Sequence, residues 1–223
     1  MEFVEYPDRE MLALLLADKL SAQLGQHLRT NDSASLCVPG GTTPTPVFES
    51  LSNSDMEWGR ITVFLGDERW VDGDHKRSNS RLLRRHLLKD KAAAANYIDL
   101  YTGNGEPEDA TETLAARIET HLPITVALLG MGNDMHTASL FPGAVALTRA
   151  LSADAPPLMA IRAEGAGEPR ITLTAPILRN AIHTHVLITG PEKRAALEVA
   201  MKSDPMQAPI RAFLDDATVH WAE

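Results

Sequence analysis

One histidine of this 223-residue chain stands in a setting typical of acid–base chemistry. His136 ends the segment GMGNDMH, which follows the apolar run ITVALL at 124–129. Of the eight histidines, it is the only one that we expect in a glycine-bounded turn at the end of a strand. An imidazole titrates near neutral pH, which suits a general acid or base. Most single histidines are structural, so the pattern makes His136 a candidate and no more.

The loop PGGTTPTP (39–46) is a second candidate site, because it follows the apolar run ASLCV. Gly40 and Gly41 let the backbone approach a ligand closely, and the free N–H groups at a helix start attract an anion. We expect Thr43 to cap this helix and Pro44 to be its first residue. The loop lacks the Gly-Lys-Ser/Thr of a Walker A motif. The sequence therefore leaves open a phosphate cradle and a plain strand-to-helix turn.

Two further patterns are too incomplete to predict a cofactor site. The G-x-G of GMGNDM follows a strand, but Met135 replaces the third glycine of a dinucleotide fingerprint, so we expect no nicotinamide cofactor. His183 and His185 alternate along one strand, and DGDH at 72–75 mixes carboxylates with a histidine. Neither group has a third or fourth ligand at convincing spacing, so we expect no metal.

The basic residues matter because the net charge of the chain is −9. Its longest basic cluster is RLLRR at 81–85, which argues against a nucleic-acid partner. A site for an anionic substrate must then be locally positive, and Arg69, Arg170 and Lys193 are the candidates that lie near predicted strand ends. Lys193 opposes the dipole of the helix it begins. A residue that violates a local rule is a candidate for function.

The elements that position these groups follow from an alternation of apolar runs and helical patterns. A helix is expected after the N-cap Asp8, with one stripe of leucines from Leu12 to Leu28. Strands are expected at 34–38, 61–65, 124–129, 158–161, 184–189 and 218–222, with a weaker one at 97–100. Helices are expected at about 44–52, 78–88, 107–121, 174–181 and 191–202. We therefore predict a single domain over 1–223, with a three-layer α/β/α fold around a mostly parallel sheet.

This architecture predicts where the site lies. In open parallel sheets, ligands bind at the carboxyl ends of the strands. Four predicted strands end in glycine and then in polar or charged groups, in PGGTTPTP, GDERW, GMGNDMH and GPEK. We expect these four loops to meet.

The bulk composition indicates a soluble protein of a reducing compartment. The first ten residues have no apolar segment, and no apolar run approaches the roughly 18 residues that a membrane span needs. Cys37 is the single cysteine, so no internal disulfide is possible. We expect a cytoplasmic protein with no membrane partner.

Several segments, in order, resemble the 6-phosphogluconolactonases of the pentose phosphate pathway. They span roughly 38 to 197, and DERWV and HTASLFPG are the most specific. The segments are PGGTTPTPVFESL, WGRITVFLGDERWVDGDHKRSN, LLGMGNDMHTASLFPG, RITLTAPIL and HVLITGPEKRAAL. The resemblance implies a Rossmann-like fold shared with the glucosamine-6-phosphate deaminases. It also implies hydrolysis of 6-phosphoglucono-δ-lactone to 6-phosphogluconate without a metal or organic cofactor. We expect a monomer or weak homodimer.

The resemblance also implies residue roles. His136 would be the general base that activates water, and Asp134 would orient it or bond a substrate hydroxyl. Asp67 and Arg69 would border the sugar. The phosphate would be held by a set of loop and basic residues, namely Gly40, Gly41, Thr42, Thr43, Arg170 and Lys193.

Two alternatives remain beside the lactonase. A deaminase of the same fold would need a further carboxylate in an H-x-x-x-x-E-P-G segment, where this chain has Phe141. A non-catalytic sugar-phosphate sensor would keep the cradle without turnover. The chain departs from the lactonase pattern at Met135, where relatives usually have glycine. We expect a negative φ at Met135, with its thioether lining the cleft.

Overall fold

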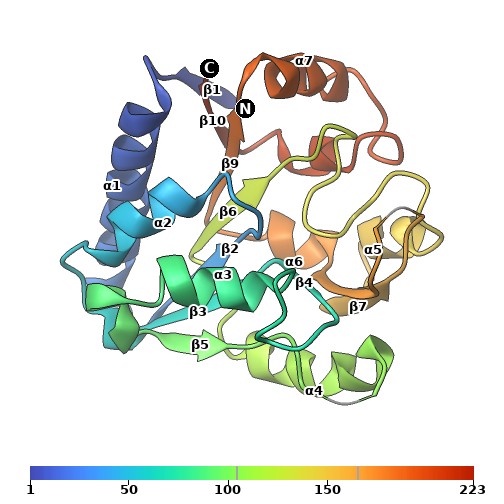
Figure 1. Ribbon diagram of the computed structural model, residues 1–223, viewed down its shortest axis with the longest axis horizontal. Helices are drawn as coiled ribbons and strands as arrows, with labels where there is room; N and C mark the ends of the chain where they lie inside the picture. Colours follow the sequence, from blue (N-terminus) through green and yellow to red (C-terminus); the bar gives the residue numbers. More distant parts are fainter. Residues whose placement is uncertain (104, 165) are drawn as a thin grey trace.

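The computed structural model describes residues 1–103, 105–164 and 166–223. Its main element is a seven-stranded sheet in the order β1-β10-β9-β6-β2-β3-β5, and every neighbouring pair is parallel (Figure 1). The strands are β1 (Glu2–Glu5), β2 (Ala34–Val38), β3 (Ile61–Leu65), β5 (Asn96–Ile98), β6 (Val126–Gly130), β9 (His183–Thr189) and β10 (Thr218–Ala222). The predicted α/β fold around a parallel sheet is confirmed. The edge strand β1 was missed, because only two of its four residues, Phe3 and Val4, are apolar and a glutamate flanks them on each side.

Helices cover both faces of this sheet, with α1 and α2 on one side and α6 and α7 on the other (Figure 1). The α-helices are α1 (Arg9–Leu28), α2 (Thr45–Ser52), α3 (Asn79–His86), α4 (Pro107–Glu119), α5 (Leu147–Leu151), α6 (Ala175–Arg179) and α7 (Pro191–Ala200). The 3-10 helices are η1 (Trp58–Arg60), η2 (Asp90–Ala94) and η3 (Pro209–Phe213). Asp8 caps α1 as predicted, because its carboxylate accepts from the Met11 N–H at 2.8 Å.

A second sheet of three antiparallel strands, in the order β4-β8-β7, was not predicted. It consists of β4 (Asp67–Arg69), β8 (Arg170–Leu173) and β7 (Leu158–Ile161). The sequence indicated only the last of these strands, since β4 is three polar residues long and β8 begins with an arginine. This sheet places Asp67, Arg69 and Arg170 beside the carboxyl end of β3.

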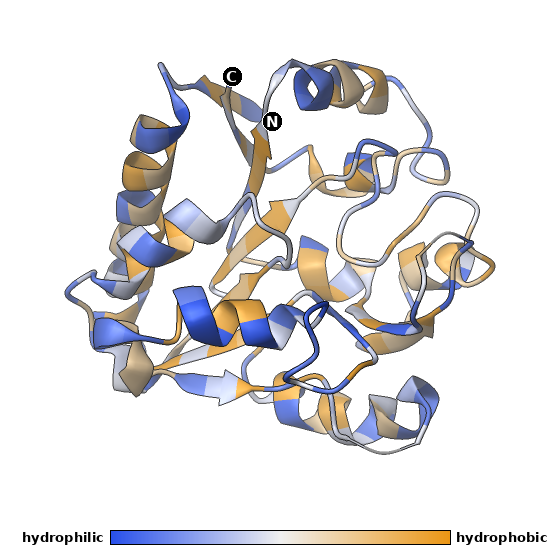
Figure 2. Ribbon diagram, in the orientation of Figure 1, coloured by the Kyte–Doolittle hydropathy of each residue, from blue (hydrophilic) through white to orange (hydrophobic). Residues whose placement is uncertain are grey.

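The core extends through both sheets. Every residue of β2 and β3 is buried, which explains why their apolar runs are continuous. Figure 2 shows the central strands of the main sheet in hydrophobic colours, whereas its edge strands and α3 carry hydrophilic residues. Residues of the small sheet, such as Ile171 and Leu173, belong to the same cluster of buried side chains. None of the helices in the described ranges is long and apolar enough to cross a membrane.

Candidate functional site

A cleft of about 200 Å³ opens at the carboxyl ends of β2, β3, β6 and β9. It brings together eight of the ten residues that the sequence predicted for the site. These eight are Gly40, Gly41, Thr43, Asp67, Arg69, His136, Arg170 and Lys193. The convergence of the four loops at one edge of the sheet is therefore as predicted, for the topological reason given above.

His136 lies in a tight turn that follows β6. The Gly132 N–H donates to the His136 carbonyl at 2.9 Å, and the Met135 N–H donates to the Gly132 carbonyl at 3.0 Å. A Cβ on Gly132 would lie 2.2 Å from the His136 Nδ1 and 2.3 Å from the Asp134 Oδ1. Only glycine therefore fits at 132. Gly130 is different, because a Cβ there would meet the Pro39 side chain at an ordinary 3.7 Å.

Asp134 orients the imidazole, although it lies outside the residues that line the cleft. Its Oδ1 is 2.5 Å from the His136 Nδ1 and also accepts from the His136 backbone N–H at 3.2 Å. The hydrogen bond to the His136 ring lowers the pKa of Asp134, which keeps the carboxylate ionised. An ionised partner on Nδ1 leaves the opposite nitrogen, Nε2, as the basic atom of the ring.

Met135 has a φ of +64°, so the expectation of a negative φ is wrong. The left-handed conformation follows from the turn itself, which must reverse the chain between Gly132 and His136. The Met135 carbonyl is also fixed, because it accepts from the Ile210 N–H of η3 at 3.1 Å. A non-glycine residue in this conformation costs about 1–2 kcal/mol. Its thioether packs against the core and is not among the groups that line the cleft.

The glycine loop enters α2 one residue later than predicted. Pro44, and not Thr43, is the N-cap residue, and no side chain caps the helix. Gly41 has a φ of +83°, which turns the chain so that Gly40, Gly41 and Thr43 line the cleft. Thr42 instead lines an adjacent hollow beside α1. The expectation that Thr42 joins the other residues in the cleft is therefore wrong, because the turn at Gly41 directs it toward α1.

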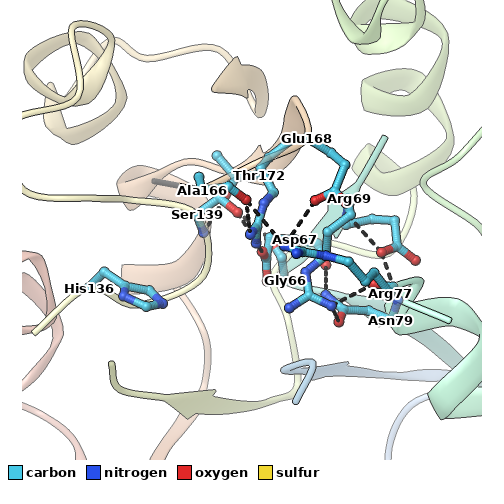
Figure 3. Close-up of polar contacts among 12 residues, drawn as sticks. Gly66, Asp67, Arg69, Arg77, Asn79, His136, Ser139, Ala166, Glu168 and Thr172 are labelled. Atoms are coloured by element: carbon cyan, nitrogen blue, oxygen red, sulfur yellow. Dashed lines mark hydrogen bonds and ion pairs between the residues drawn. The ribbon is translucent and has the colours of Figure 1, made fainter. Parts of the chain in front are cut away.

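Asp67 connects the small sheet to the histidine turn (Figure 3). Its Oδ2 accepts from the Ser139 hydroxyl at 2.5 Å and lies 3.7 Å from Nη1 of Arg170. The Arg170 side chain is 9% exposed, and its Nη2 donates to the Ala166 carbonyl at 3.0 Å. Burial lowers the pKa of Arg170, while the Asp67 carboxylate acts in the opposite direction. Arg170 Nε is buried and has no hydrogen-bond partner among the described residues.

Lys193 brings a further positive charge to the cleft. It stands in the first turn of α7, as predicted, and its Nζ donates to the Met131 carbonyl at 2.7 Å. Partial burial lowers the pKa of Lys193, and the nearby Asp134 carboxylate acts against this effect. An ammonium group has three donors, so two remain for an anionic ligand.

Two further side chains, which the sequence did not predict as site residues, lie at the cleft or against His136. Asn79, the first residue of α3, lines the cleft, and only its position at the start of a predicted helix could have indicated a role. Phe141 packs against the catalytic candidate, with its ring centroid 4.5 Å from that of His136. The Arg170 guanidinium carbon lies 5.5 Å from the same ring, so Phe141 contacts both groups. Its apolar ring lies tilted against the imidazole, at an interplanar angle of 40°.

The other histidine patterns do not form a ligand site. His185 is buried and bonded to His220, and His183 begins β9. Within the described ranges, no group of three or more His, Cys, Asp or Glu side chains could hold a metal ion.

Comparisons with known proteins agree with this geometry. A family model described as "Glucosamine-6-phosphate isomerases/6-phosphogluconolactonase" matches residues 7–221. The chain is 41% identical to a 6-phosphogluconolactonase of Rhizobium meliloti, over 95% of this chain and 94% of that protein. It is 39% identical to one of Pseudomonas aeruginosa, over 92% of this chain and 88% of that protein. A crystal structure of a 6-phosphogluconolactonase from Shewanella baltica matches with a TM-score of 0.96 and 33% identity, over 100% of this chain and 98% of that one. The chain therefore belongs to the glucosamine-6-phosphate isomerase/6-phosphogluconolactonase family.

Proposed function

We propose that this chain is a 6-phosphogluconolactonase, which hydrolyses 6-phosphoglucono-δ-lactone to 6-phosphogluconate in the oxidative pentose phosphate pathway. The observation that carries the proposal is the cleft itself. It combines a histidine oriented by a carboxylate with a glycine loop and two separate cationic groups, Arg170 and Lys193. Hydrolysis of a lactone ester requires a general base, and recognition of a phosphate on the same small molecule requires backbone donors and cationic groups.

His136 acts as the general base. Its Nδ1–H donates to Asp134, and Nε2 takes a proton from the water that attacks the lactone carbonyl. The resulting tetrahedral intermediate expels the ring oxygen when the C–O bond breaks. His136 then returns the proton to that oxygen, which becomes the free hydroxyl of the open-chain acid. General acid–base catalysis of this kind contributes about 10²–10⁴-fold.

The phosphate binds between the glycine loop and the cationic groups. Gly40, Gly41 and Thr43 offer backbone and hydroxyl donors. Arg170 and Lys193 supply local positive charge at the cleft of a chain whose net charge is −9. Thr42 lies in the same loop but faces the adjacent hollow beside α1, so we assign it no contact with the phosphate. Asp67 and Arg69 border the sugar.

The lactonase is favoured over a deaminase by Phe141. A deaminase would need a carboxylate at this position to assist ring opening, and a phenyl ring cannot transfer a proton. A sensor that binds the sugar phosphate without turnover would not need the Asp134–His136 pair. We further propose that residues 1–223 act as one domain, as a monomer or weak homodimer in the cytoplasm. No metal or organic cofactor enters this mechanism.

The test is a lactonase assay with purified protein, in which spontaneous hydrolysis in buffer is subtracted. We expect acceleration that is unchanged by EDTA. A rate equal to that of buffer would overturn the proposal, and tight binding of 6-phosphogluconate without turnover would indicate a sensor. Arg170→Ala and Lys193→Ala are expected to raise KM for the phosphorylated lactone, with little change for unphosphorylated gluconolactone.

A further inference from the structure

Asn79 occupies a central place in the cleft wall. Only 2% of its surface is exposed, and its carboxamide forms two hydrogen bonds to β4 (Figure 3). Nδ2 donates to the Asp67 carbonyl at 3.0 Å, and Oδ1 accepts from Arg69 Nη1 at 2.8 Å. The side chain therefore contacts two residues that line the cleft, Asp67 through its backbone carbonyl and Arg69 through its guanidinium.

The buried carboxylate of Glu68 fixes the start of α3 and thereby Asn79. Glu68 is 0% exposed and lies on β4, between the two pocket residues. Its carboxylate accepts from the Asn79 and Ser80 N–H groups at 2.8 and 2.6 Å, and from its neighbour, the Arg69 N–H, at 2.7 Å. A carboxylate at a helix N-terminus satisfies N–H groups that have no partner within the helix. Asn79 therefore cannot move without breaking buried hydrogen bonds.

The glycine loop contacts Asn79 from the other side. A Cβ on Gly40 would lie 2.1 Å from the Asn79 Oδ1 and 2.2 Å from its Cγ. The Gly40 backbone thus lies directly against the carboxamide. Since Asn79 lies between this loop and Arg69, the position of its carboxamide determines how far apart they are.

Arg69 depends on this contact for its orientation. Its Nη1 donates to Asn79 Oδ1 and to the Arg77 carbonyl at 2.6 Å, which uses both hydrogens of that nitrogen. Its Nε is buried and has no partner among the described residues. The guanidinium is therefore held by one edge.

We propose that Asn79 is a positioning residue, whose carboxamide holds the Arg69 guanidinium in the cleft wall at a fixed separation from the Gly40 loop. Its effect on catalysis is transmitted through Arg69. This inference rests on the proposed function, because lactone hydrolysis is its main readout.

The first test compares Asn79→Ala with a matched control, Asn96→Ala. Asn96 also donates to a backbone carbonyl, that of Gly59 at 3.0 Å, but on the exposed edge strand β5. We expect kcat/KM of Asn79→Ala to fall about 10- to 100-fold, since a displaced substrate-binding group costs about that much. The control should stay within about twofold. An unchanged kcat/KM in folded Asn79→Ala would overturn the proposal.

A double-mutant cycle separates positioning from a purely structural role. Arg69→Ala removes the group that Asn79 holds, so adding Asn79→Ala should lower kcat/KM little further. Full additivity of the two losses would overturn the proposal. Should Asn79→Ala fail to fold, Asn79→Asp keeps an oxygen acceptor for Arg69, and its kcat/KM should remain well above that of Arg69→Ala. A value equally low would contradict the proposal.

The wild type and the variants of the double-mutant cycle also separate a failure of this proposal from a failure of the proposed function. If the wild type does not hydrolyse the lactone, the function fails and the cycle is measured instead as Kd for 6-phosphogluconate. Non-additive losses of affinity would then still support the role of Asn79, and additive losses would overturn it.

Discussion

His136 at the end of β6 and the pair His185–His220 beneath α1 show the same side chain in two environments. The His136 side chain is 31% exposed, faces a cleft and is bonded to a carboxylate. His185 and His220 are 1% and 0% exposed and are bonded to each other at 2.9 Å. One environment leaves a ring nitrogen available to a ligand, whereas the other uses every ring nitrogen within the fold.

The buried pair forms a chain of four side chains with one consistent direction of donation. The Tyr6 hydroxyl donates to His220 Nδ1, His220 Nε2 donates to His185 Nδ1, and His185 Nε2 donates to Gln23 Oε1. This arrangement requires both rings to be neutral. Burial lowers the pKa of His185 to about 4 and that of His220 to about 3, which provides that state. The comparison shows that burial and partners, and not residue type, separate a structural histidine from a catalytic candidate.

Apart from removal of His136 itself, the largest effect is expected from Gly132→Ala, which disturbs the cleft histidine and its Asp134 partner. The new Cβ would collide with the His136 and Asp134 side chains and rotate the imidazole away. We expect kcat to fall about 100-fold, as for other displacements of a reacting group. Gly25→Ala in α1, where a Cβ meets nothing within 4 Å, is the control and should keep its kcat. A normal kcat in Gly132→Ala would show that the turn tolerates a different geometry.

His220→Ala is expected to do the reverse, lowering stability while leaving kcat per folded molecule unchanged. It leaves the Tyr6 hydroxyl and His185 Nδ1 without a partner, and each buried unsatisfied group costs about 1–3 kcal/mol. Chemical denaturation measures the loss, with His75→Ala in an exposed turn as the control. If His220→Ala were as stable as that control, the buried chain would have no structural importance.

Acid should lower the unfolding free energy through the two buried histidines. Both buried histidines have a folded pKa below the usual value of about 6.5, so the unfolded state binds more protons below that pH. The stabilisation that these neutral rings provide is fully present above about pH 6.5, and it decreases as the pH falls toward 4. Each ring lowers the unfolding free energy by up to about 1.4 kcal/mol per pH unit in this range. His185→Gln, followed by denaturant titrations from pH 7 to 4.5, should show a smaller slope than the wild type. An identical slope would mean that His185 does not titrate differently on folding.

The smallest effect is expected at Met135. Met135→Gly relieves the positive φ, but it adds flexibility to the unfolded chain and removes a partly buried side chain. We expect a net gain of at most about 1 kcal/mol in unfolding free energy. Met206→Gly, at an exposed position with ordinary φ, should instead lose stability. A loss at both positions would show that the side-chain contacts of Met135 outweigh its strain.

The parts of the fold that follow from hydrophobic patterning were predictable. β2, β3 and β6 are continuous apolar runs bounded by glycine or proline, and the parallel topology then fixes where their following loops meet. His136 and the glycine loop were found for this reason. The small sheet was not predicted, because β4 is three polar residues whose burial depends on partners distant in the sequence.

Features that arise from tertiary contacts were also missed. The sign of φ at Met135 is set by a turn closed through the Gly132 carbonyl and held by η3, and no local propensity indicates it. Asn79 became visible only once α3 was placed against β4 and the glycine loop. Thr42 was assigned to the cleft by its place in the sequence, whereas the positive φ at Gly41 directs it elsewhere.

The most direct test of the account is the kcat of His136→Ala, measured beside its Kd for 6-phosphogluconate. A general base acts mainly in the transition state, so we expect kcat to fall about 10²–10⁴-fold while Kd changes little. Circular dichroism and the melting temperature confirm that the variant is folded. A folded His136→Ala protein that keeps most of the wild-type kcat would contradict the account, since His136 would then be structural, as His185 and His220 are.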